Sequence, residues 1–234
     1  MSQTSKGDLT TELLTVYLQH LLVRWGREQP PRTGLHASAV LVPTREWCVR
    51  RQVLSASLAD PFPIGNTWHT NALFLHGWTL HEKWQQLFRR FAQVVEIESA
   101  HYDETHHLHF TPDAVLAFAG ERYVVEIKGY HAEHYLSLHS PPKAAVQQAN
   151  LYMHLLGVSR AIILVENKNT QEFKLWVLAY DPDAVQPYLE RIAAVKAAQA
   201  SAAAGHGLPA RVCASRQDAL AMRCPVREAC FAQP

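Results

Sequence analysis

The chain has 234 residues, 48% of them hydrophobic and 18% charged, so it is long enough for one sizeable core and its composition excludes wholesale disorder. The formal net charge is +1, so a nucleic-acid partner would have to be held by local basic patches and not by overall charge. The start, MSQTSKGDLT, has no apolar core, and no apolar run approaches the roughly 20 residues of a membrane span, so we expect a cytoplasmic protein without membrane contact.

The N-terminal part predicts one amphipathic helix. Apolar residues follow helical spacing over residues 8–25, and Gly26 is the expected stop. We expect this helix to pack in the core. Pro-containing breaks follow at residues 29–34 and 60–65.

A second amphipathic helix is predicted over residues 71–91. It contains Gly77 and His81, which lie four apart and therefore on one face. The missing side chain at Gly77 would permit close approach of another backbone segment. Taken alone, a histidine on such a face is more often a satisfied core residue than a metal ligand.

Residues 94–98 then read as a strand, and residues 99–107 as a polar loop dense in histidine. A second loop that bears histidines is expected at residues 131–139. These histidines could bind a metal as a cluster, or they could simply be polar residues of solvent-exposed loops.

A β-hairpin spans residues 112–128, with Gly120 and Glu121 supplying turn chemistry between two short runs rich in Val, Leu, Phe and Tyr. A turn centred there puts Asp113 opposite Lys128, and one centred a residue earlier puts it opposite Glu126. Both registers place the three side chains on one face. Carboxylates are the ligands that Mg²⁺ or Mn²⁺ prefers, although Glu-x-Lys on a strand is by itself usually a solvated ion pair.

The remainder predicts a helix over residues 143–156, strands over 161–166 and 172–180, and a helix over 183–200. In the first of these helices, Gln148 and Tyr152 share one face. No internal repeat is evident.

The combination of Pro112-Asp113 with Glu126-Ile127-Lys128 resembles the PD-(D/E)XK nuclease superfamily. The Gly129-Tyr130 pair, the GxxxHE pattern at 77–82 and the QxxxY pattern at 148–152 are similar to its RecB-like branch. The resemblance implies hydrolysis of phosphodiesters with Mg²⁺ or Mn²⁺. It implies metal ligation by His81, Asp113, Glu126 and the carbonyl of Ile127, catalysis by Lys128, and substrate contact by Gln148 and Tyr152. Arg50 and Arg51 are further candidates for phosphate contact.

All four cysteines lie outside residues 77–152, the segment that carries the nuclease-like patterns. Cys48 resembles the upstream cysteine of iron-sulfur nucleases of this branch, in which it joins three downstream cysteines around a 4Fe-4S cluster. The resemblance implies that Cys213, Cys224 and Cys230 complete such a cluster, with a longer gap between Cys213 and Cys224 than the close pair usual there. Zinc is the competing metal, and scattered core cysteines are the plain alternative.

We therefore expect an α/β (α+β) fold with a restriction-endonuclease-like core: a mixed central sheet flanked by helices. The expected parts are an N-terminal helix (1–35), the nuclease core (36–200) and a cysteine-rich tail (201–234) joined to the N-terminal segment by a metal-cluster staple. The expected function is an exonuclease on single-stranded DNA ends, with recombination or CRISPR adaptation proteins as partners. The alternative is a non-catalytic module that binds DNA ends or docks a partner.

Overall fold

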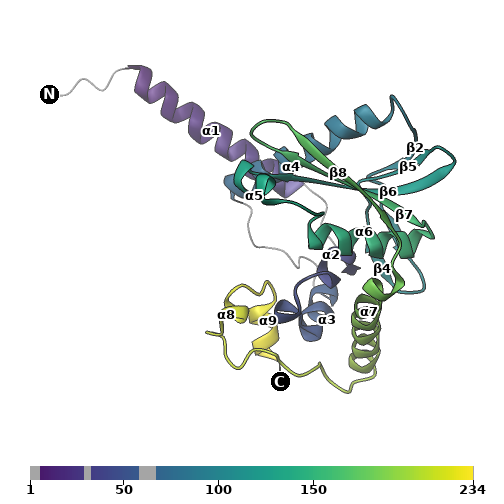
Figure 1. Cartoon of the computed structure of the whole chain (residues 1–234). Coiled ribbons are helices and arrows are strands. Elements are labelled where there is room, and N and C mark those ends of the chain that lie inside the picture. The colour runs from purple at the N-terminus through teal and green to yellow at the C-terminus, as the bar shows by residue number, and fades with distance from the viewer. Residues whose placement is uncertain (1–5, 29–32, 58–66, 234) are drawn as a thin grey trace.

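A five-stranded mixed sheet forms the centre of the molecule (Figure 1). The computed structural model describes residues 6–28, 33–57 and 67–233. Strands run in the order β2-β5-β6-β7-β8, and only the β6/β7 pair is parallel. The strand bounds are β2 Gln93–Ile97, β5 Ala114–Phe118, β6 Glu121–Tyr130, β7 Arg160–Asn167 and β8 Phe173–Ala179. The expected fold class of a mixed sheet flanked by helices is confirmed.

Helices cover both faces of this sheet. On one face, α4 (Trp68–Phe88) packs Leu80, Trp84 and Phe88 against strand residues such as Ile127. The opposite face is covered by α6 (Lys143–Leu156), and α7 (Pro182–Ala203) packs on α6, so that both helices contribute to the larger core cluster. At one end of the sheet, the end of β2 and the start of β5 lie near α4.

The β5/β6 hairpin has the earlier of the two predicted registers. Ala114 pairs with Val125 and Phe118 with Glu121, so the pairing continues to Asp113 opposite Glu126. Ala119 and Gly120 form the turn, both with positive φ (52° and 81°), as the tight turns of twisted hairpins require. The predicted turn position at Gly120-Glu121 is therefore one residue too late.

The helix α1 (Lys6–Glu28) is not a core helix, contrary to expectation (Figure 1). Its apolar side chains, including Leu13 at 64% and Tyr17 at 61%, are largely exposed. Contact with α4 is made towards its end, where the Asn71 side chain donates to the Leu22 carbonyl. Gly26 does not stop α1; a Cβ there would lie 2.2 Å from Asn71 Nδ2, so this glycine permits the close approach.

Both histidine-bearing segments contain regular structure instead of loops alone. The first forms β3 (His101–Asp103) and β4 (Leu108–Phe110), which join β1 (Leu35–His36) in a small sheet of order β1-β4-β3. The second forms α5 (Ala132–Ser137). Ring stacking helps to explain these short strands, since His36 stacks on His109 and His101 on Phe110.

The remaining elements are short helices near the two ends of the chain: α2 (Ala37–Val40), η1 (Thr44–Glu46), α3 (Val49–Ser57), α8 (Ala219–Met222) and α9 (Arg227–Ala232). In Figure 1, α8 and α9 lie beside α3, away from the central sheet. The predicted loop at 60–65 and most of the break at 29–34 lie outside the described residues. None of the helices in the described segments is long and apolar enough to span a bilayer.

Candidate functional site

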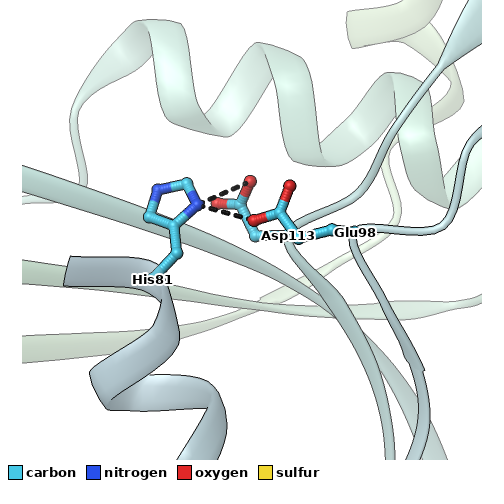
Figure 2. Close-up of side chains that lie close together, drawn as sticks. All are labelled: His81, Glu98 and Asp113. Atoms are coloured by element: carbon cyan, nitrogen blue, oxygen red, sulfur yellow. Dashed lines mark hydrogen bonds and ion pairs between the residues drawn. The ribbon is translucent and has the colours of Figure 1, made fainter. Parts of the chain in front are cut away.

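Three side chains from three elements converge at the sheet edge (Figure 2). His81 comes from α4, Glu98 directly follows β2, and Asp113 directly precedes β5. His81 Nδ1 lies 2.9 Å from Glu98 Oε1 and 3.7 Å from Asp113 Oδ1. One ligand atom from each of the three residues falls within 4.8 Å of the others, so one cation can be held between them.

Neighbouring donors orient both carboxylates. Asp113 Oδ2 accepts a hydrogen bond of 2.6 Å from the backbone amide of Ile127. The side chain of Gln85, one turn after His81 on α4, donates to Glu98 Oε1 at 3.1 Å and to the Asp113 carbonyl at 2.9 Å. These contacts are the supporting layer that metal sites use to fix ligand direction.

Glu126 and Lys128 form an ion pair beside this group. Glu126 is completely buried, and its Oε1 pairs with Lys128 Nζ. Within the described segments, its Oε2 has no hydrogen-bond partner. Because an unpartnered buried carboxylate oxygen is costly, this acceptor fits a site that takes a cation.

Burial and neighbouring charges shift the pKa values of this group. Burial and the neighbouring charge of Asp113 raise the pKa of Glu126 to about 8, although Lys128 opposes the shift. Burial also raises the pKa of Asp113, despite the cations His81 and Lys128. For His81 and Lys128, burial alone would lower the pKa, but the surrounding carboxylates outweigh it and raise both. A divalent ion would let the acids ionise.

Helix α6 presents Tyr152 and Gln148 near the same acids. Gln148 Nε2 donates to the Tyr152 hydroxyl at 3.4 Å, and Tyr152 is buried. Burial raises the pKa of Tyr152, and the charges of Glu126 and Asp113 raise it further. The phenol is therefore close enough to sense both carboxylates, from the sheet face opposite α4.

Solved structures with similar folds include two of an exonuclease. The alkaline exonuclease LHK-Exo from Laribacter hongkongensis aligns with TM-score 0.55 and 10% identity, covering 74% of this chain and 91% of that one. LHK-Exo in complex with dAMP aligns with TM-score 0.57 and 14% identity over the same shares. The structure named SSO0001 aligns with TM-score 0.52 and 14% identity, covering 95% of this chain and 98% of that one.

The fold of this chain is therefore similar to that of LHK-Exo. No protein-family model matches the sequence, and comparison with curated proteins gives no match. Because the sequence identity to these structures is only 10–14%, the similarity concerns the fold, and the function of this chain depends on its own residues.

Two supporting residues escaped the sequence analysis. Glu98 was read only as the last residue of a strand, and Gln85 as part of a helix. The signal for Glu98 was an acid at a strand end next to the hairpin, and for Gln85 its position one turn after His81. The close backbone approach expected at Gly77 is not seen in the described part of the chain, where a Cβ at this position would meet nothing within 4 Å.

Arg50 is buried against the C-terminal segment and not placed with the acidic group. It is 2% exposed, and its guanidinium donates to the carbonyls of Pro209, Cys230 and Gln233. These three bonds tie α3 to the C-terminal segment, a structural role that differs from the expected contact with phosphate. Arg51 lines a cavity with the cysteines.

All four cysteines line that one cavity, together with three arginines. The thiols interact electrostatically: burial raises the pKa of Cys213, as do Asp218 and the other three thiols. Burial likewise raises the pKa of Cys224, although Arg51 opposes the shift. Among the residues that the structure describes, no three thiols lie within 4.8 Å of one another.

Proposed function

We propose that this protein is a divalent-metal-dependent deoxyribonuclease that acts as an exonuclease on single-stranded DNA ends. The observation that carries the proposal is the convergence of His81, Glu98 and Asp113 beside the buried Glu126-Lys128 pair, on a fold shared with an exonuclease. One similar structure holds dAMP, a nucleotide of the kind that an exonuclease releases.

We assign the metal to His81, Asp113, Glu126 and the carbonyl of Ile127, and add Glu98 as a ligand or a positioning acid. Mg²⁺ or Mn²⁺ would supply charge for the phosphate and an activated water. Lys128, whose pKa the neighbouring carboxylates raise, would stay an ammonium, orient that water and offset the negative charge that develops on the phosphate. Gln148 and Tyr152 would contact the substrate strand from α6.

The test is digestion of end-labelled single-stranded DNA with Mn²⁺. We expect stepwise loss of nucleotides that EDTA abolishes and that Lys128→Ala reduces by about 100-fold or more, the scale of losing a group aimed at the reacting charge. Arg160→Ala, an exposed surface variant, is the matched control and should cleave normally. Cleavage that resists EDTA or survives the lysine change contradicts the proposal, and binding of DNA ends without cleavage favours a non-catalytic module.

We further propose that Cys48, Cys213, Cys224 and Cys230 hold a 4Fe-4S cluster that joins the tail (201–234) to the core (36–200). Support comes from the shared cavity, whose arginines would favour thiolates. Four thiolates bound to one zinc at about 2.3 Å each would lie roughly 4 Å from one another. The described thiols do not gather this closely, so a 4Fe-4S cluster, which is larger than one zinc ion, fits their spacing better.

Anaerobically purified protein should be brown, with broad visible absorbance and about four iron atoms per chain, as a 4Fe-4S centre requires. Cys224→Ser should bleach it. A colourless protein with one zinc per chain would replace this assignment with a zinc site and leave the nuclease proposal untouched.

A further inference from the structure

Large aromatic side chains stand exposed on the helix that carries His81: Trp68 at its first residue, and Phe74 and Trp78 nearer to the histidine. Phe74 is 65% exposed and Trp78 is 51% exposed. Together with His81 and Gln85 they occupy positions i, i+4, i+7 and i+11 of α4. At 3.6 residues per turn these positions form one stripe, so the exposed aromatic half runs directly into the metal-site half.

Among the residues that the structure describes, the space beside this stripe is open. Residues of α4 that pack on the sheet begin at Leu80. Before it, a Cβ added at Gly77 would meet no described atom within 4 Å, and α1 reaches α4 at Asn71. The first turns of α4 therefore extend beyond the sheet, and their rings can be approached from solvent next to the site.

We propose that Phe74 and Trp78 form a stacking platform for the bases of a single DNA strand whose backbone enters the His81 site. This inference rests on the proposed function for the identity of the ligand. The rise of a helix puts Trp78 about 4.5 Å and Phe74 about 10 Å along the axis from His81, which is within a few nucleotides of the reacting phosphate. Stacking on exposed rings suits single strands, whose bases are free, and is indifferent to sequence.

Continuity with the acidic group favours DNA over a protein as the occupant. A docking site for a helix or a second copy has no reason to continue into a half-buried histidine that contacts two carboxylates. The exposed apolar side chains of α1 belong to another helix, which packs on α4 at Asn71, so variants at Phe74 and Trp78 leave them unchanged.

The experiment measures binding in EDTA, so that hydrolysis plays no part. The probes are a fluorescent oligothymidylate and an abasic strand of equal length that keeps the phosphates and lacks the bases. We expect Phe74→Ala and Trp78→Ala each to weaken oligothymidylate binding by about 5- to 100-fold, the range that base stacking on aromatics contributes. Binding of the abasic strand should stay unchanged, and Trp78→Phe should restore most of the loss.

Leu73→Ala is the matched control, because Leu73 is 53% exposed on the same helix but lies off the stripe. It should bind both probes like the wild type. Equal losses on both probes, no loss at all, or a wild-type chain that does not bind oligothymidylate would each overturn the platform. A change in oligomer mass without a change in DNA binding would overturn it in favour of protein docking. Platform binding without hydrolysis would refute only the proposed catalysis.

Discussion

The carboxylate of Asp113 accepts a hydrogen bond of 2.6 Å from the backbone amide of Ile127, across the two strands of the hairpin. This contact occupies Oδ2 and leaves Oδ1 directed at His81, 3.7 Å away. One side chain therefore connects the hairpin to α4. The aspartate is held in place before any ion arrives, so little ordering is left to be done on binding.

Asp113→Asn should abolish metal-dependent cleavage while leaving the fold intact. The amide keeps the size of the side chain and can still accept from Ile127, but it loses the charge. We expect a fall in cleavage rate of about 100-fold or more, because even supporting residues of metal sites cost 10- to 100-fold. The measurement is the digestion rate of labelled single-stranded DNA at saturating Mn²⁺. Asp183→Asn, at an exposed position, is the control, and equal activity of both variants would contradict the assignment.

Glu98→Gln tests the acid that sequence reasoning missed. Removing its charge should weaken Mn²⁺ binding and cleavage by about 10- to 100-fold, because Glu98 accepts from both His81 and Gln85. Glu96→Gln is the matched control on the same strand, since Glu96 pairs with His101 instead. Calorimetric titration with Mn²⁺ separates the two. A loss in Glu96→Gln that matches the loss in Glu98→Gln would mean that the strand, not the site, is disturbed.

The hairpin was predictable because local features specify it. Alternating apolar residues set the faces, and the glycine limited the turn to two registers that agree on the shared face of Asp113, Glu126 and Lys128. Glu98 was not predictable in this way. Its position depends on the pairing of β2 with β5, which shifts register between Val94 and Glu96, and on a backbone φ of 46° at Glu98 itself. Neither has a local sequence signal.

The errors at α1 and in the histidine-rich segments have a common cause. Helical spacing predicts that α1 is a helix and has an apolar face, but only the tertiary fold decides whether that face is covered. The strands β3 and β4 have three residues each and gain stability from ring contacts across the small sheet. Contacts between residues distant in sequence cannot be read from local propensity.

Arg50→Ala should loosen the C-terminal segment. It removes the donors for three carbonyls, so we expect a loss of about 2–4 kcal/mol in unfolding free energy. Denaturant unfolding measures this loss, and limited proteolysis should cut the tail faster. Arg45→Ala, whose side chain is 85% exposed, is the control and should change stability by less than about 0.5 kcal/mol. Normal stability of Arg50→Ala would show that these three hydrogen bonds do not hold the tail.

The pKa of Glu126 predicts how stability without metal depends on pH. The folded-state pKa of about 8 is raised above the ordinary value of 4.5, so the folded state binds the proton more tightly than the unfolded one. Stability from this group is fully present below pH 4.5 and is lost as pH rises to about 8. Glu126→Gln cannot ionise and should lack this loss. The measurement is thermal unfolding in EDTA between pH 5 and pH 9, and it compares how the stability of the wild type and of Glu126→Gln changes with pH.

Metal should reverse this trend, because Mn²⁺ binds the ionised carboxylate and competes with its proton. The affinity of the wild-type protein for Mn²⁺ should therefore rise with pH and level off above about 8, with protons released on binding below that pH. Titrations in two buffers of different ionisation enthalpy count those protons. Glu126→Gln should bind more weakly and release fewer protons. An affinity that is flat between pH 6 and about 8 would remove Glu126 from the ligand set, because a metal-binding acid with this pKa must lose its proton in that interval.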